Sequence, residues 1–464
     1  MPHAATANLL TLHGLIALVA ILFYVVTSHV ARQRRQPAAA IAWVLFMLLL
    51  PYLALPAFLT FGLRKLRYPH ADAPKHRPSH DGSHPWAIET TMALGQPAPA
   101  IYQDLNLHKD GSEARAALLD IIDGAQASID LSTFILGNDT LGDTVVEHLC
   151  RQARRGVRVR LLLDGMGSLM AGHPNFRAFT QAGGKVAIFV PFLRSFLKGG
   201  ANLRDHRKLI VADAGLEAAR LWCGGRNLAE EYFDGKSDLP PWRDLSFDVR
   251  GPLVAQASAL FDGDWRYANG EPRRPQPLLP DGLSLPQYGA QLIASGPDQD
   301  DDTLYALLVT AAYRAQRRVV LVTPYFVPDP ALLTALCLAA RRGVAVELLL
   351  PARSNHRLSD FARERALRAM VDAGAKVWLA PAMLHAKCVI VDDVLALAGS
   401  ANLDGRSLFL NFEMMVAFHK GTDVGRFANW CEQERRTTRP YVASRPGLIR
   451  DVAEGTLLWI AFQL

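Results

Sequence analysis

The sequence predicts an α/β protein made of two similar halves with pseudo-two-fold symmetry, preceded by two N-terminal membrane segments. Three observations lead to this prediction: two long apolar runs near the N-terminus, a helix–strand pattern that occurs twice, and two matching polar motifs. A chain of 464 residues is also too long for one ordinary hydrophobic core, so more than one packed unit is expected.

Residues 1–67 predict a membrane anchor with two hydrophobic segments, at about 9–27 and 38–63. A helix needs about 20 apolar residues to cross a bilayer, and both runs are near that length. A cleaved signal peptide is the alternative for the first run, but it would carry its positive charges before the apolar stretch. Here the arginines follow that stretch, within 32–35, so we expect a retained anchor.

The second apolar run contains two prolines, Pro51 and Pro56. Proline interrupts helical hydrogen bonding, so this run is either a kinked span or a re-entrant hairpin. Basic residues flank both of its ends, and only the hairpin places both basic flanks on the cytoplasmic side.

The net charge of +6 lies entirely in the membrane-flanking part of the chain. Eight basic and two acidic residues precede Gly82, so the remainder is formally neutral. Basic flanks favour anionic lipid headgroups as partners. A neutral remainder argues against a nucleic-acid groove, which would need a basic surface.

Five cysteines are scattered along the chain without a C-x-x-C pair, so neither a disulfide framework nor a zinc site is expected. An odd number of cysteines fits a domain that faces the cytoplasm. They are Cys150, Cys223, Cys337, Cys388 and Cys431.

Residues 68–99 are rich in Pro, His, Ala, Ser and Gly, which predicts a linker. Beyond it the chain repeats itself. Arg-Arg-Gly-Val ends a helical pattern at 154–157 and again at 341–344, and a β-branched run follows each time. Glycine at such a position supplies the left-handed cap that ends a helix. Ala-Gly-x-Lys-Val behaves in the same way at 182–186 and 373–377.

This repeat predicts helices layered on a largely parallel sheet, twice over. The two halves are expected at 100–268 and 289–464, separated by the Pro-rich residues 270–288.

Each half also carries the motif H-x-K-x4-D, followed by a glycine turn that ends in Asn and then by a carboxylate. In the first half these residues are His206, Lys208, Asp213, Asn227 and Asp244. In the second half they are His385, Lys387, Asp392, Asn402 and Glu413. One such motif would be weak evidence, whereas two at matching positions of a repeat are strong.

The spacing has a chemical logic. His and Lys two residues apart on a strand point to the same face, so both can reach one cleft. Two histidines that face each other suit a displacement at phosphorus, in which one attacks and the other protonates the leaving alkoxide. Two Lys and two Asn can hold the non-bridging oxygens, so no metal and no other cofactor is required.

The carboxylates differ in what the sequence implies. Asp244 and Glu413 are candidates to hydrogen-bond the imidazoles and fix their tautomer. Asp213 and Asp392 stand beyond the buried strand, so direct chemistry and a structural turn are equally open for them.

The paired motif resembles the H-K-D signature of the phospholipase D superfamily. Further segments are similar, more narrowly, to bacterial cardiolipin synthases: 131–134, 163–168, 323–329, 354–357 and the membrane segment 40–62. This resemblance implies transfer of a phosphatidyl group from one phosphatidylglycerol to another, with release of glycerol, through a covalent phosphohistidine. Phosphatidylglycerol and anionic membrane lipids are the expected partners, and the inner membrane is the expected location.

Other functions remain open. A hydrolase of the same fold, either a phospholipase D or a nuclease, would use water as the acceptor. A transphosphatidylase would use another lipid or alcohol as the acceptor. A non-enzymatic membrane scaffold would tolerate a broken motif, and both motifs here are complete. The sequence indicates neither which His attacks nor the oligomeric state.

Overall fold

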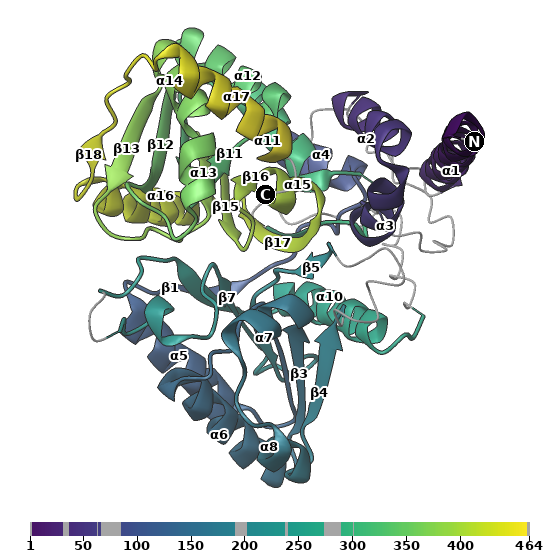
Figure 1. Ribbon diagram of the computed structural model, residues 1–464. Helices are drawn as coiled ribbons and strands as arrows, with labels where there is room; N and C mark the ends of the chain where they lie inside the picture. The colour runs from purple at the N-terminus through teal and green to yellow at the C-terminus, as the bar shows by residue number, and fades with distance from the viewer. Residues whose placement is uncertain are drawn as a thin grey trace.

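The structure is a computed structural model that describes residues 2–30, 37–62, 64–65, 85–190, 202–236, 240–272, 289–299 and 301–461. Figure 1 shows two α/β halves stacked on each other, the first in blue and teal and the second in green and yellow, with the N-terminal helices beside them.

The first N-terminal helix, α1 (Pro2–Val30), contains a stretch long and apolar enough to cross a membrane, Thr11–His29. The second predicted segment, 38–63, is not one helix. It divides into α2 (Pro37–Leu49) and α3 (Pro51–Phe61), and Leu50 lies between them. These helices have 13 and 11 residues, fewer than the about 20 that a crossing requires. Two spanning segments are therefore not confirmed.

Helices α2 and α3 fold back on each other. The rings of Trp43 and Phe58 are 5.2 Å apart, whereas a straight helix would separate residues 15 apart by about 22 Å. Pro51 supplies the break, because its ring is compatible with the first turn of α3 but not with continuation of α2. Both helices pack against α1 through a small apolar cluster that includes Tyr24 and Met47.

The predicted linker 68–99 is described only from residue 85 onward. That part includes α4 (Trp86–Ala93), where Ala87 and Ile88 are fully buried. Ala87 belongs to the core of the second half, so the folded region begins before residue 100.

The first half is built on a seven-stranded sheet with the order β1-β8-β7-β6-β2-β3-β4. Its strands are β1 (Gln103–Leu107), β2 (Ser128–Thr133), β3 (Arg158–Asp164), β4 (Lys185–Phe189), β6 (Leu209–Ala212), β7 (Arg220–Gly224) and β8 (Ser246–Arg250). Its helices are α5 (Gly111–Gly124), α6 (Thr140–Arg154), α7 (Gly165–Ala171), α8 (Arg177–Gln181), the short η1 (Glu230–Tyr232) and α10 (Leu253–Ala268).

The second half repeats this topology. Its main strands are β9 (Ala290–Ser295), β10 (Arg318–Val322), β12 (Ala345–Pro351), β13 (Lys376–Ala380), β14 (Cys388–Val391), β15 (Leu395–Gly399) and β17 (Asn411–Phe418). Short strands are β11 (Phe326–Val327), β16 (Leu403–Asp404) and β18 (Arg439–Pro440). Its helices are α11 (Thr303–Arg314), α12 (Pro330–Arg341), α13 (Arg357–Ala362), α14 (Glu364–Asp372), α15 (Gly405–Phe409), α16 (Gly421–Arg435) and α17 (Leu448–Ala461).

The sheets are mixed, which corrects the expectation of a largely parallel arrangement. Among the main strands of each half, the parallel pairs are β2–β3 and β3–β4, then β10–β12 and β12–β13. The motif strands β6 and β14 instead run antiparallel to β2 and β10. They also pair antiparallel with their successors β7 and β15, to which short turns connect them.

The glycines that the repeat marked as helix ends adopt left-handed conformations. Gly156 and Gly343 have φ of 90° and 92°, and Gly183 and Gly374 both have φ of 98°. The predicted helix ends are confirmed at all four positions.

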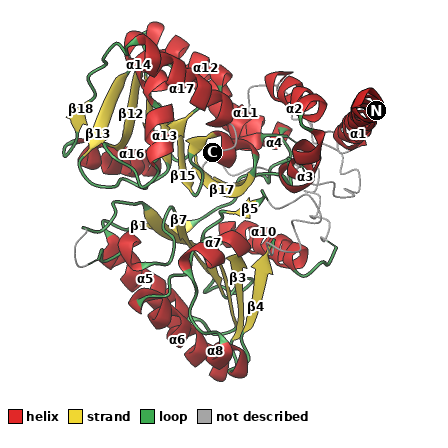
Figure 2. Cartoon of the chain, viewed as in Figure 1, coloured by secondary structure: helices red, strands yellow, loops and turns green. Residues whose placement is uncertain are grey.

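One hydrophobic core is shared by both halves. It includes Phe247 and Phe261 from the first half, and Phe418 and Phe427 from the second. Helices cover the outer faces of both sheets, as Figure 2 shows in red and yellow. The halves are therefore held in a fixed relationship, which sets the geometry where they meet.

Candidate active site

Both H-x-K motifs lie at the junction of the halves, at equivalent edges of the two sheets. His206 lies between the short strand β5 (Arg204–Asp205) and β6, and His385 directly precedes β14. Leu209 pairs with Ser132 near the end of β2, and Cys388 pairs with Val322 at the end of β10. Each histidine therefore lies at the carboxyl edge of the parallel strands, the usual place for a site in an α/β sheet.

The backbone of each histidine is bonded to the other half of the chain. The amide of His206 donates to the carbonyl of Phe412, at 2.9 Å, and the amide of His385 donates to the carbonyl of Arg243, at 2.7 Å. Phe412 immediately precedes Glu413, and Arg243 immediately precedes Asp244. Each histidine thus donates the equivalent backbone hydrogen bond to the opposite half, to the residue that precedes the carboxylate of that half.

The side chains cross in the same way. Nδ1 of His385 lies 2.7 Å from Oδ2 of Asp244, and Nδ1 of His206 lies 3.1 Å from Oε1 of Glu413. The sequence marked both carboxylates as imidazole partners. It gave no sign that each carboxylate would reach the histidine of the opposite half.

Burial and charge lower the pKa values of both histidines. Burial, with the nearby charge of Lys208, lowers the pKa of His206 to about 4. Burial, with the charge of Lys387, lowers the pKa of His385 to about 3. Both imidazoles are therefore neutral at pH 7 when the site is empty, which is the form that can act as a nucleophile.

The lysines and carboxylates complete a compact charged cluster. Burial lowers the pKa of Lys208 to about 8 and that of Lys387 to about 7. Burial alone would raise the pKa of Glu413 and of Asp244, but neighbouring cationic side chains lower both. Lys387 also lowers the pKa of His206, so the charges of one motif act on the other.

Neighbouring residues of the glycine turns and of α15 fix the positions of the two carboxylates. The hydroxyl of Ser400 donates to Glu413 at 2.5 Å, and the hydroxyl of Ser407 donates to it at 2.8 Å. At the equivalent place in the first half, a Cβ on Gly225 would lie 2.2 Å from Oδ1 of Asp244. Gly225 is therefore required for the close approach of that carboxylate.

The two asparagines are buried near the motifs. The amide of Asn227 donates to the hydroxyl of Tyr232 at 2.8 Å, and the ring of Tyr232 lies 5.0 Å from that of His385. Among the described residues, neither Oδ1 of Asn227 nor Oδ1 of Asn402 has a hydrogen-bond partner. Both amides thus retain polar groups that are not committed to the fold.

Asp213 and Asp392 lie away from this cluster. Asp213 accepts hydrogen bonds from the backbone amides of residues 126–128, and Asp392 accepts them from residues 316–318. Both have positive φ, 54° and 50°. Seven residues of extended chain separate Asp213 from His206, or about 23 Å. The structure does not bring these two aspartates to the histidines.

Aromatic side chains surround the histidines, and the sequence gave little sign of this. The Phe134 ring lies 4.8 Å from that of His206. The Trp242 ring lies 5.5 Å from that of His385, and the Tyr325 ring lies 6.5 Å from it. These apolar walls account for the strong burial effect on the imidazole pKa values.

Arg207, the middle residue of the first motif, is fully buried and links the halves. Its guanidinium bonds Asp264 at 2.5 Å and Asp298 at 3.1 Å, and its Nε donates to the carbonyl of Glu413 at 3.1 Å. Ala386 stands at the matching position of the second motif. Sequence reasoning missed this residue, because arginine at the variable position of a motif reads as a surface side chain.

Within the described part of the chain, no group of three or more His, Cys, Asp or Glu side chains could hold a metal ion. The absence of a metal requirement remains a prediction.

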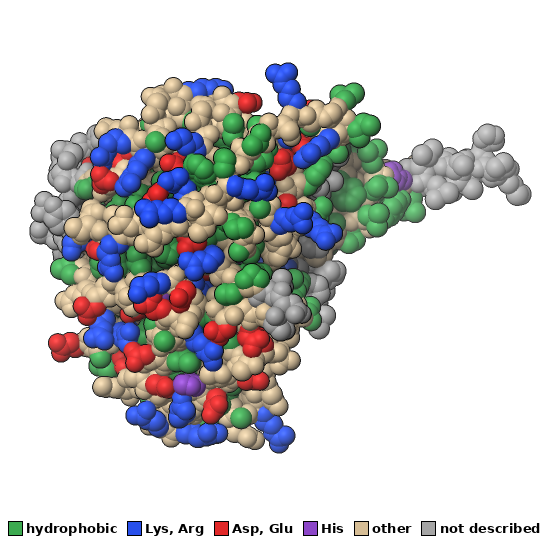
Figure 3. All heavy atoms as spheres, turned by 90° about the vertical axis from the view of Figure 1, so that its left-hand side faces the viewer, with side chains coloured by type: hydrophobic (Ala, Val, Ile, Leu, Met, Phe, Trp, Pro, Cys, Tyr) green, Lys and Arg blue, Asp and Glu red, His purple; other side chains and the backbone are tan. Residues whose placement is uncertain are grey.

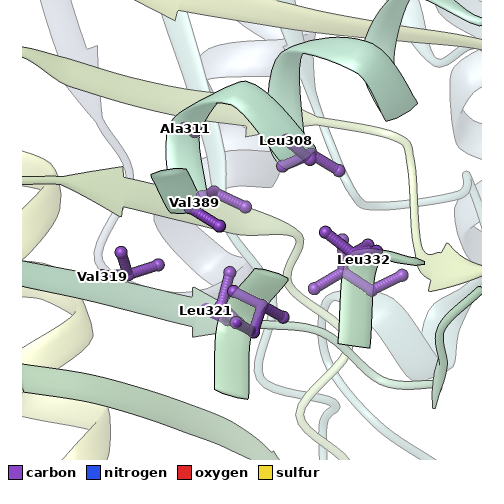
Figure 4. A pocket seen from close by; sticks show the side chains of 9 residues that line it. Leu308, Ala311, Val319, Leu321, Leu332 and Val389 are labelled. Atoms are coloured by element: carbon purple, nitrogen blue, oxygen red, sulfur yellow. The ribbon is translucent and has the colours of Figure 1, made fainter. Parts of the chain in front are cut away.

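A small apolar cavity lies elsewhere, between α11 and the second sheet, and is lined by Leu308, Val319, Leu321, Leu332 and Val389 (Figure 4). It contains no polar group that could take part in the chemistry.

Basic and acidic side chains are intermixed on the face shown in Figure 3. A single-sign patch of the kind that binds nucleic acid is not visible on that face.

The family model described as "Cardiolipin synthase, PLD-like domain" matches residues 118–265 and 308–435. Cardiolipin synthase A of Pseudomonas entomophila (strain L48) is 33% identical over 428 residues, which cover 87% of each chain. Cardiolipin synthase of Geobacillus thermodenitrificans (strain NG80-2) is 30% identical, over 89% of this chain and 85% of its own.

A solved structure shares the fold. The crystal structure of phosphatidylserine synthase from Haemophilus influenzae Rd KW20 matches with a TM-score of 0.62 at 14% identity, over 81% of this chain and 100% of that one.

Proposed function

The chain belongs to the cardiolipin synthase family of phospholipase D-like proteins, and from this premise we propose that it is itself a cardiolipin synthase. It transfers a phosphatidyl group from one phosphatidylglycerol to a second, which yields cardiolipin and glycerol. The observation that carries the proposal is the reciprocal pairing of two buried histidines with the carboxylates of opposite halves. This arrangement provides one nucleophile and one proton donor on opposite sides of a phosphodiester.

The reaction proceeds in two displacements. A neutral imidazole attacks phosphorus, and the bond from phosphorus to the glycerol oxygen breaks. The second imidazole, in its protonated form, gives its proton to that oxygen, and glycerol leaves. A hydroxyl of the second phosphatidylglycerol then gives its proton to the second imidazole and attacks phosphorus, which releases the first histidine.

The low imidazole pKa values fit this sequence of steps. One histidine must be neutral in order to attack, and both are neutral in the empty site. An anionic phosphodiester that enters the site favours the charged form of a nearby imidazole. Substrate binding therefore supplies the conditions under which the second histidine takes up its proton.

Lys208 and Lys387 hold the non-bridging oxygens, together with Asn227 and Asn402. Both lysines are almost fully buried, so their charges act in a medium of low polarity. Each carboxylate orients the imidazole opposite it and stabilises the positive charge that develops there.

For Asp213 and Asp392 we infer a structural role in a turn, in place of a direct role in the chemistry. Each carboxylate accepts backbone amides at the turn that begins β2 or β10. Each therefore fixes the strand whose far end carries the site.

The proposed domain arrangement keeps 1–67 as membrane anchor and 100–268 and 289–464 as the two halves. The predicted linker 68–99 is shortened at its end, because α4 packs into the core of the second half. The folded-back pair α2–α3 favours the re-entrant alternative. A re-entrant pair places both of its basic flanks on the cytoplasmic side of the inner membrane, with the catalytic halves.

The competing function is a phospholipase D-type hydrolase or a transphosphatidylase with another acceptor. Purified protein in phosphatidylglycerol vesicles, with labelled glycerol added, separates these functions. A shared covalent intermediate predicts that label enters phosphatidylglycerol. A second arm contains phosphatidylethanolamine, and its mixed products would show that another lipid alcohol is accepted. Label that never enters lipid, with phosphatidic acid accumulating, would replace the proposal with the hydrolase.

A further inference from the structure

Two short helices flank the histidines at equivalent places in the two halves. Helix α7 follows β3, and helix α13 follows β12 after a short loop. Since the histidines lie at the carboxyl edges of the same strands, both helices lie beside the site. Figure 1 shows them on the near side of the molecule, one in each half.

Contacts connect α7 to the first histidine. Asp164 caps α7 and accepts the amide of Asp205, the residue before His206, at 2.8 Å. A Cβ on Gly167 would lie only 1.8 Å from the carbonyl of Phe134, whose ring contacts His206. Helix α7 is therefore packed directly against the wall of the site.

Contacts of the same kind connect α13 to the second histidine. The Tyr325 hydroxyl donates to Oδ1 of Asn355 at 2.5 Å, and the Tyr325 ring lies 5.2 Å from that of His356, the N-cap of α13. Tyr325 in turn faces His385.

Large apolar side chains are exposed on both helices. Leu169 and Met170 at the end of α7 are 66% and 69% exposed, and Leu358 on α13 is 55% exposed. Helix α17 packs on α13 and leaves Leu448 and Ile449 exposed as well. Exposed apolar side chains that gather at a site mark a contact surface rather than chance.

The charges beside this surface favour an anionic partner. Arg353 and Arg357 are exposed close to Leu358 in the sequence, and Arg177 is exposed at the start of α8, the helix that follows α7. The acidic side chains Asp360 and Asp451 of α13 and α17 pair with Arg363 and Arg365 instead. Exposed apolar side chains with arginines on the same elements or on neighbouring ones are typical of protein surfaces that lie in the headgroup region of an anionic bilayer.

The position of the membrane helix α1 also supports contact of this surface with a bilayer. Helix α1 lies beside the two halves in Figure 1, and α7, α13 and α17 are on the near side of the molecule. The inference places α1 and the apolar side chains in the same bilayer surface.

We propose that the exposed apolar side chains of α7, α13 and α17 form a rim that rests in the bilayer surface and opens the histidine site toward lipid headgroups. The inference rests on the proposed function, since a site for bilayer-resident lipid must face the bilayer. The rim consists of Leu169, Met170, Leu358, Leu448 and Ile449.

The fold supplies matched controls at the opposite edges of the same sheets. Leu216, 47% exposed, follows Asp213, and Val394, 39% exposed, follows Asp392. They occupy the turns after β6 and β14, at the ends of these strands away from the histidines.

The test compares two substrates in full-length protein reconstituted into vesicles. Leu169→Asp with Met170→Asp, and separately Leu358→Asp, should lower turnover of long-chain phosphatidylglycerol in the bilayer by about tenfold. Turnover of a short-chain, monomeric phosphatidylglycerol should change less than about twofold, since it needs no docking. Leu216→Asp and Val394→Asp should leave both rates unchanged. Equal losses with both substrates, or equal losses in the control variants, would overturn the proposal.

A second measurement does not depend on turnover. All five native cysteines are buried, so a new surface cysteine can be labelled selectively. An environment-sensitive fluorophore at Leu169→Cys should be quenched by brominated lipids, whereas the same label at Leu216→Cys should not. Equal quenching at both positions would overturn the rim. A wild-type protein that forms no cardiolipin from either substrate would refute the proposed function, and the labels would still decide the rim.

Discussion

Oδ2 of Asp244 lies 2.7 Å from Nδ1 of His385, although the two residues belong to different halves of the chain. Glu413 stands in the same relationship to His206, at 3.1 Å. Neither half therefore contains a complete site, and the chemistry requires both.

This crossing predicts which histidine responds to each carboxylate. Asp244→Asn should lower kcat by about 10- to 100-fold, because an amide cannot stabilise the imidazolium, and Glu413→Gln should do the same. The ring ¹⁵N shifts of His385 should respond to Asp244→Asn, and those of His206 to Glu413→Gln. Asp262→Asn is the control, since Asp262 pairs with Arg160 and Arg266. If Asp244→Asn shifted mainly the His206 signals, the crossing would be wrong.

The two histidines should act as one unit. His206→Ala and His385→Ala should each remove product formation, and the double variant should be no worse than either single variant. Near-normal turnover in one single variant would refute the two-histidine mechanism. Circular dichroism of each variant checks that the fold is retained.

Asp213 should matter for stability rather than for chemistry. Asp213→Ala removes an acceptor for three backbone amides and places alanine at a φ of 54°, at a cost of about 2 kcal/mol. The thermal midpoint should fall, while kcat of the folded protein at low temperature stays within about twofold of normal. Asp213→Asn, which tolerates this conformation, should be milder. A large loss of kcat without a change in the thermal midpoint would show that Asp213 takes part in the chemistry.

Acid should destabilise the protein through its histidines. The folded-state pKa values of His206 and His385, about 4 and about 3, lie below the ordinary 6.5. Between pH 6.5 and about 4 the unfolded chain therefore binds more protons, and the free energy of unfolding falls as the pH falls. Thermal midpoints measured across this range should drop less steeply in His385→Asn than in the wild type. Identical slopes of thermal midpoint against pH in the two proteins would show that the imidazole of His385 is not held neutral in the folded state.

Much of the site could be predicted from the sequence, because the repeat places equivalent residues in equivalent positions. The histidines, the lysines and the carboxylates Asp244 and Glu413 do meet. The repeat does not show whether a carboxylate contacts the histidine of its own half or that of the other half. This depends on how the two halves pack. The crossing, and the reach of Arg207 into the second half, are contacts of this kind.

Other differences have local causes, and some left a signal in the sequence. Pro51 marked the break between α2 and α3, but the sequence left a kinked span and a re-entrant hairpin both open. Two aspartates at equivalent strand ends were compatible with a turn, and only the backbone hydrogen bonds decided their place. Helix α4 is short and follows Pro85, so the surrounding composition concealed it.

The central claim, that the paired histidines transfer a phosphatidyl group between lipids, is tested most directly by the products. Full-length protein in vesicles of phosphatidylglycerol alone should produce cardiolipin and free glycerol in equal amounts, measured by mass spectrometry and an enzymatic glycerol assay. His385→Ala in the same vesicles is the matched blank. Phosphatidic acid as the main product, with little cardiolipin, would show that water is the true acceptor and would contradict this account.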